Sequence, residues 1–122
     1  MNKSGKGKSA YDLEERTFQF AKAVRLFIKT LPKTIANVED SKQVVRSSGS
    51  VGSNYREANE ALSKKDFIMR IKISRKEAKE SLYWLRLIYE TNTLKNSDEA
   101  ENLINEADEL TKIFSSILVK SS

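Results

Sequence analysis

The chain has 122 residues, which is the size of one ordinary domain, and its net charge is +5. It contains neither cysteine nor histidine, so disulfides are excluded and the side chains most often used as metal ligands, nucleophiles and proton carriers are missing. No apolar run reaches the length of about 18 residues that a membrane-spanning helix needs, and no apolar stretch follows the first lysines as in a secretory signal. Together with the absence of cysteine, this composition favours a cytoplasmic protein without membrane contact.

The positive charge is unevenly distributed along the chain. Lys3, Lys6 and Lys8 supply three of the five net charges and lie among glycine and serine. We therefore expect residues 1–10 to form a flexible basic tail before a folded domain of residues 11–122. Residues 63–91 contain eight basic and four acidic side chains, whereas residues 97–122 contain two basic and six acidic ones. A basic segment is thus followed by an acidic one inside the folded domain.

The first amphipathic segment covers about residues 11–31. Its apolar positions recur at steps of four and three residues, which is the spacing of one helix face. The row consists of Leu13, Thr17, Phe20, Val24, Phe27 and Leu31. Pro32 disfavours helical backbone at Leu31 and predicts that the helix ends there.

The second segment, about residues 38–62, has a start signal at Asn37 and Asp40 and an unusual centre. Its row consists of Val44, Ser48, Val51, Tyr55, Ala58 and Leu62. Residues 47–53 are serine, glycine and valine, and each glycine costs about 1 kcal/mol in a helix relative to alanine. This stretch is either a loop between two short helices or part of one helix whose small side chains admit a neighbouring backbone. The unbroken row favours the continuous helix.

The third and fourth segments repeat the same spacing. The third begins at Ser63, with Asp66 three residues later as in a capping box. Its row consists of Phe67, Ile71, Ser74, Ala78, Ser81, Leu85 and Ile88. After the polar residues 92–97, with Asn96 or Ser97 as the cap, the fourth row consists of Ala100, Leu103, Ala107, Leu110, Phe114 and Ile117.

Four such rows joined by short connections predict an all-α fold, an antiparallel up-down-up-down four-helix bundle. Bundles can hold carboxylate-bridged metals, and Glu57 with Glu60 and Glu77 with Glu80 form two Glu-x-x-Glu pairs. The usual arrangement also needs histidine, which is absent, and no phosphate-binding loop motif occurs. We therefore expect no metal, no cofactor and no enzymatic activity.

Polar residues form a second row beside the apolar one on the second and third segments. These rows are either solvated faces or a contact surface in which Arg46 or Arg75 pairs with Glu57 or Glu77, within the bundle or between subunits. Near the end of the third segment, the aromatic residues Tyr83, Trp84 and Tyr89 also leave two alternatives. They either pack in the core or form an exposed surface for another subunit or for stacked bases.

Several runs of the sequence resemble a known protein family. The first is residues 12–16 with Phe20, Ala21, Leu31 and Pro32, and the more specific runs are residues 46–47, 50–58, 65–67, 76–80 and 83–85. They resemble the bacterial four-helix-bundle proteins encoded in intervening sequences of 23S ribosomal RNA, over about residues 11–91. The polar signature of that family falls on Arg46, Asn54, Glu57, Lys65, Asp66 and Glu77.

The resemblance implies an antiparallel bundle that assembles as a ring-shaped homopentamer. The family also resembles the accessory protein of diversity-generating retroelements, which works with a reverse transcriptase and nucleic acid. Association with RNA is implied for the intervening-sequence members by where their genes lie.

Two functional hypotheses follow from the basic third segment. The first is a non-catalytic oligomer that binds nucleic acid, most simply structured RNA, through phosphate contacts. The residues expected to bind are Lys64, Lys65, Arg70, Lys72, Arg75, Lys76 and Arg86, although they cannot all share one helix face. The second is a protein-interaction scaffold or accessory subunit, in which the basic segment meets an acidic surface such as that of residues 97–122.

Overall fold

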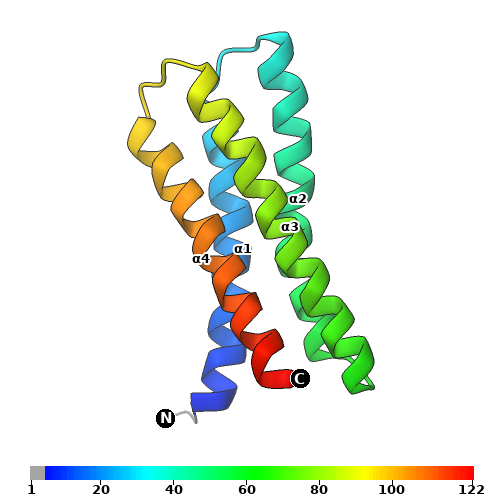
Figure 1. Cartoon of the computed structure of the whole chain (residues 1–122). Helices are drawn as coiled ribbons and strands as arrows, with labels where there is room; N and C mark the ends of the chain where they lie inside the picture. The colour runs from blue at the N-terminus through cyan, green and yellow to red at the C-terminus, as the bar shows by residue number, and fades with distance from the viewer. Residues whose placement is uncertain (1–4) are drawn as a thin grey trace.

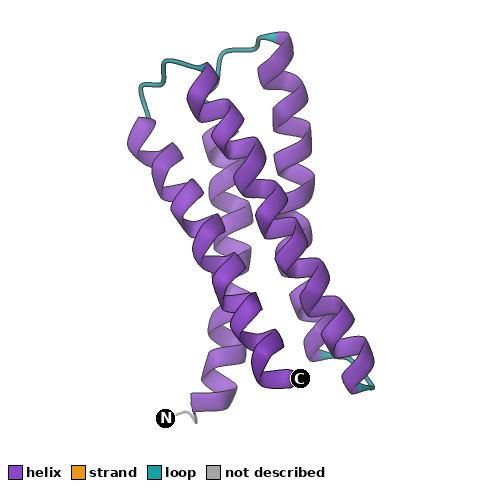
Figure 2. Cartoon of the chain, viewed as in Figure 1, coloured by secondary structure: helices purple, strands orange, loops and turns teal. Residues whose placement is uncertain are grey.

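The structure is a computed structural model that describes the backbone of residues 5–122 and the side chains from Asp12 onward. It consists of four helices, and no strand occurs in this range (Figure 2). The helices are α1 (Gly5–Ile28), α2 (Ile35–Asn59), α3 (Lys64–Thr91) and α4 (Ser97–Ser121). The predicted all-α four-helix bundle is confirmed.

The helices run alternately up and down, and each packs against its neighbours in the chain (Figure 1). The contact between α2 and α3 is the most extensive, that between α3 and α4 is next, and α1 closes the bundle against α2 and α4. Helices α1 and α3 lie on opposite corners, as do α2 and α4. The outer side of α3 is therefore far from α1.

The core consists of the four apolar rows. From α1 and α2 it takes Leu13, Phe20, Val24, Phe27, Leu31, Val44, Val51, Tyr55 and Ala58, and from α3 and α4 Ile71, Ala78, Leu85, Ile88, Ala100, Leu103, Ala107, Leu110 and Phe114. Thr17, Ser48, Ser74 and Ser81 are buried with them, as their places in the rows predict. The Ser74 hydroxyl donates a hydrogen bond across the helix pair to the Val51 carbonyl at 2.9 Å. Such partners allow small hydroxyl groups to be buried without an unmet hydrogen bond.

The glycine- and serine-rich stretch of α2 is helical throughout, so the continuous-helix interpretation is confirmed. A Cβ atom on Gly52 would lie 2.9 Å from Thr17 Oγ1 and 3.1 Å from Thr17 Cβ. Helix α1 thus approaches α2 so closely here that only a hydrogen fits at position 52. On the α3 side, Ser47 and Ser81 share a hydrogen bond of 2.8 Å between their hydroxyls.

Four predicted boundaries differ from the structure, one of them the start of α2, which is Ile35 instead of about residue 38. Helix α1 begins at Gly5, so residues 5–10 of the predicted tail are helical, while residues 1–4 lie outside the described residues. The same helix ends at Ile28, before a turn in which the Thr30 and Leu31 amides donate to the Phe27 and Ile28 carbonyls. Helix α2 ends at Asn59. Leu62, predicted as a core residue, is fully exposed in the turn that follows.

Asn37 has a different role from the predicted start signal. Helix α2 is capped by Thr34, whose hydroxyl accepts a hydrogen bond from the Asn37 amide at 3.1 Å. The Asn37 side chain is buried, donates to the Pro32 carbonyl and exchanges two hydrogen bonds with the Asn92 side chain. These bonds join the α1–α2 loop to the end of α3. At the start of α3, Ser63 is the cap, as predicted.

Candidate nucleic-acid interface

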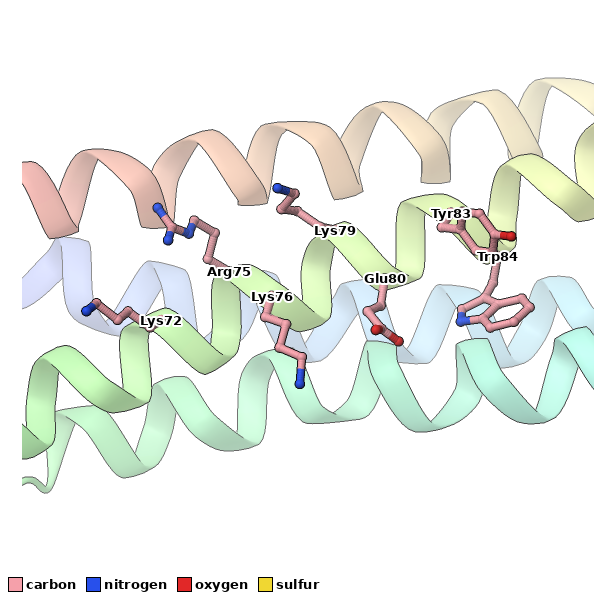
Figure 3. A pocket seen from close by; sticks show the side chains of 7 residues that line it. All are labelled: Lys72, Arg75, Lys76, Lys79, Glu80, Tyr83 and Trp84. Atoms are coloured by element: carbon pink, nitrogen blue, oxygen red, sulfur yellow. The ribbon is translucent and has the colours of Figure 1, made fainter.

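The outer side of α3 carries an open groove of about 550 Å³, which we call the basic groove (Figure 3). It is lined by Lys72, Arg75, Lys76, Lys79, Glu80, Tyr83 and Trp84. All seven residues come from one helix and lie within little more than three turns of it. The groove therefore depends on the straightness of α3 rather than on any loop.

Helix spacing explains why these side chains meet. Lys72, Lys76, Lys79 and Tyr83 follow one another at steps of four, three and four residues, which places them on one solvent-facing side of α3. Figure 3 shows Arg75 and Lys79 extending toward α4, and Lys76 and Glu80 toward α2. The row on the opposite side of α3 is the buried one, so core packing fixes which side faces the solvent.

The cations of the basic groove form no ion pair within residues 12–122. Four basic side chains face one acid, Glu80, and Glu80 itself lies 3.6 Å from Arg46 of α2. Lys72, Arg75, Lys76 and Lys79 form no ion pair with any described side chain. The groove is thus an uncompensated positive surface, which attracts anions and phosphates above all.

The two aromatic residues of the groove have different environments. Trp84 is partly buried and packs against the core, whereas 58% of Tyr83 is exposed. Their rings meet edge to face, with centroids 5.0 Å apart and an angle of 84° between the planes. The Trp84 Nε1 is buried and has no hydrogen-bond partner within the described chain. Trp84 therefore packs against the core, as in the first alternative, whereas the Tyr83 side chain is exposed at the surface.

Tyr89 does not join this surface. Its hydroxyl donates to the Glu101 carboxylate of α4 at 2.6 Å, and this hydrogen bond raises the pKa of Tyr89 above its ordinary value. Tyr89 also packs partly against the core. Trp84 and Tyr89 thus pack against the bundle, whereas Tyr83 is exposed.

Of the seven residues predicted to bind nucleic acid, only Lys72, Arg75 and Lys76 line the basic groove. Arg70 donates to the Asn54 side chain at 3.0 Å, and Arg86 pairs with Glu90 one turn later at 2.8 Å. Both guanidinium groups are thus engaged in contacts within the bundle.

Lys64 and Lys65 are exposed in the first turn of α3, outside the groove. Lys79 was not among the predicted residues. It lies one heptad after Lys72 and two heptads after Lys65. That spacing was the available signal, because residues seven apart share a helix face.

The polar signature of the predicted family lies mainly between α2 and α3. Arg46 pairs with the buried Glu77 at 3.1 Å, which confirms one of the four pairings considered from the sequence. The Asn54 side chain accepts from Arg70, and the Asp66 amide donates to the Ser63 cap. Glu57 and Lys65 are exposed. Arg46, Asn54 and Glu77 therefore act within the fold, at the interface of two helices.

The acidic helix α4 does not neutralise the basic groove through ion pairs. Glu106 pairs with Arg16 of α1 at 2.7 Å, and Asp108 pairs with Lys112 of its own helix at 3.1 Å. No ion pair links α3 and α4 within residues 12–122. The basic α3 and the acidic α4 therefore keep their opposite charges on the solvent-exposed surface.

The described residues contain no group of three or more acidic side chains close enough to hold a metal ion. None of their helices is long and apolar enough to cross a membrane.

A second groove, of about 490 Å³, lies between α1 and α2 on another side of the bundle. Its apolar lining includes Phe18 and Leu26, both at least half exposed, beside Gly49 and Gly52. We call it the apolar groove.

Comparisons with known proteins agree with the fold. Residues 10–116 match the family model described as 23S rRNA-intervening sequence protein. A crystal structure of a protein of unknown function from the S23 ribosomal protein family of Bacteroides thetaiotaomicron is similar, with a TM-score of 0.75 and 33% identity, over 86% of this chain and 96% of that one. The search of curated proteins gave no significant match. The chain therefore belongs to the 23S rRNA-intervening sequence protein family.

Proposed function

We propose that the protein is a non-catalytic RNA-binding bundle whose basic groove holds the phosphates of structured RNA. The observation that carries the proposal is the set of four unpaired cations, Lys72, Arg75, Lys76 and Lys79, gathered on one side of α3. When basic side chains without a partner in the protein bind phosphates, they displace the counterions condensed on the nucleic acid. This release drives binding without sequence preference. The family description, which refers to an intervening sequence of 23S rRNA, supports RNA over DNA.

The ion pairs of α4 also support this function over the alternative that the acidic residues of α4 neutralise the cations of α3. Two acidic residues of α4, Glu106 and Asp108, pair with Arg16 of α1 and Lys112 of α4, and within residues 12–122 no acidic residue of α4 forms an ion pair with α3. A positive surface that the molecule does not neutralise is available to an external anion.

The test is a titration of a fluorescent RNA hairpin with wild type and two matched double variants at about 50 mM salt. Lys76→Ala with Lys79→Ala removes two charges from the basic groove. Lys22→Ala with Lys29→Ala removes two exposed charges, one from α1 on the opposite corner and one from the turn that follows α1. We expect the first variant to bind at least about tenfold more weakly and the second to bind nearly as well as wild type. No wild-type binding, or equal losses in both variants, would contradict the proposal.

A second candidate function, contact with another protein subunit, is favoured by the apolar groove. Phe18 and Leu26 are exposed beside a close contact of α1 and α2, and neighbouring exposed apolar side chains are typical of protein interfaces. The occupant that the family resemblance implies is a further copy of this chain in a homo-oligomeric ring. Light scattering would show a mass above that of one chain, and Leu26→Glu should lower it. A wild-type mass of one chain would contradict this assembly.

A further inference from the structure

Tyr83 stands at one end of the basic groove, with its ring exposed and its position fixed. The edge-to-face contact with Trp84, at 5.0 Å between centroids, supports the ring from one side. Trp84 in turn packs against the core. An aromatic ring that is both exposed and held in place offers a flat surface without the entropic cost of ordering it on binding.

Lysines continue from Tyr83 along the same side of α3. Lys79 lies one turn before Tyr83, about 6 Å along the axis, and Lys76 lies about 10 Å before it. From Tyr83 to Lys72 the groove extends about 16 Å, which corresponds to about five nucleotides at the rise of a stacked strand. An aromatic ring next to a line of cations can contact one base and the adjoining phosphates of a nucleic-acid strand.

We propose that the basic groove binds unpaired nucleotides, with one base stacked on Tyr83 and the adjoining phosphates on Lys79, Lys76 and Lys72. The inference rests on the proposed RNA-binding function and adds the class of RNA element that is recognised. In a duplex both faces of each internal base are covered by its neighbours, so a base is free to stack on a side chain only in a loop, a bulge or a single strand. The basic groove would therefore distinguish unpaired from paired RNA.

The test compares three ligands with equal numbers of phosphates: oligoadenylate, an abasic ribose-phosphate chain and a blunt RNA duplex. Trp84 is the only tryptophan, so its emission reports directly on binding beside Tyr83. We expect oligoadenylate to bind about 5- to 150-fold more tightly than the abasic chain, which is the range of one base stacked on an aromatic ring. Tyr83→Ala should abolish this difference, and Tyr83→Phe should preserve it. Neither variant should change the affinity for the abasic chain or for the duplex.

Equal affinities of the wild type for oligoadenylate and the abasic chain would overturn the inference. So would equal losses for both ligands in Tyr83→Ala. If all three ligands still bind and all weaken in Lys76→Ala with Lys79→Ala, the proposed function stands while stacking fails. If none binds, both fail. Because Tyr83 is exposed, its variants should unfold at the wild-type temperature, which checks that folding is unchanged.

Discussion

At the scale of single residues, the bundle is most sensitive where a small or charged side chain meets another helix. Gly52 and Gly49 lie three residues apart on α2, and both face α1, but they meet different kinds of neighbour. At Gly52 an added Cβ would lie against Thr17 Cβ and within 3.5 Å of its backbone, which cannot move independently of the helix. At Gly49 it would lie 3.1 Å from the end of the Arg25 side chain, which is flexible.

The two glycines should therefore respond differently to alanine. Gly52→Ala should lower the free energy of unfolding by about 1–3 kcal/mol, because α1 must shift away. Gly49→Ala should change it by less than about 1 kcal/mol, since better helix propensity offsets the displaced arginine. Urea unfolding followed by circular dichroism measures both. Equal effects would show that the close approach at position 52 does not control the packing of α1.

A second prediction concerns the ion pair between α2 and α3. The Glu77 side chain is only 9% exposed, whereas that of Arg46 is 53% exposed. Arg46→Ala would leave a buried carboxylate without its cation, and we expect a loss of about 2 kcal/mol. Adding Glu77→Gln should recover part of the loss, because the remaining group is neutral.

The solvent-exposed pair of Lys42 and Glu39 serves as the control for this experiment. Lys42→Ala should change the free energy of unfolding by less than about 0.5 kcal/mol. If Arg46→Ala is equally mild, the contact with Glu77 does not stabilise the bundle more than an exposed ion pair does.

At the scale of elements, the helices could be predicted from the sequence because each apolar row keeps its period for its full length. The periodicity of α2 even predicted a continuous helix through Gly49 and Gly52. Helix ends depend on local hydrogen bonds that periodicity does not report, which is why the Thr34 cap and the exposure of Leu62 were missed. Asn37 was misinterpreted for a related reason: its partner, Asn92, is 55 residues away.

The candidate site was only partly predictable. Charge density along the sequence indicated α3, the helix that carries the basic groove, but it did not distinguish the sides of that helix. Arg70 contacts Asn54 of α2, a neighbour that helix spacing does not identify, whereas Arg86 pairs with Glu90 four residues later, a contact that the spacing alone indicates. Heptad spacing from Lys72 could have indicated Lys79, whereas the exposure of Tyr83 became evident only from the packed structure.

Because only part of α3 lines the basic groove, two pairs of exposed lysines on this helix should differ in their effect on RNA binding. Lys64→Glu with Lys65→Glu changes charge at the first turn, outside the basic groove, whereas Lys76→Glu with Lys79→Glu changes it inside. Both variants should keep the helical circular dichroism signal, since all four side chains are exposed. We expect the second pair to weaken RNA binding much more than the first in a filter-binding assay. The opposite order would move the interface to the start of α3.

At the scale of the whole molecule, different helix pairs form the close packing contacts and the two grooves. Helices α1 and α2 approach closely through small side chains and leave the apolar groove at their junction. Helices α2 and α3 form the most extensive contact and are joined by the Arg46–Glu77 pair. This contact directs the basic groove outward, on the corner opposite α1. In an oligomeric ring, the positive surface of each subunit would be repeated, and the affinity for a long RNA would rise with it.

The central claim is that phosphates occupy the basic groove, and the salt dependence of RNA binding tests it most directly. For the wild type, the logarithm of the association constant should fall linearly with the logarithm of salt concentration. In Lys76→Ala with Lys79→Ala the slope should be smaller by about 1.4 to 1.8, which is the loss of two phosphate contacts. A wild-type affinity that does not change with salt, or a slope that is the same in the variant, would contradict the account.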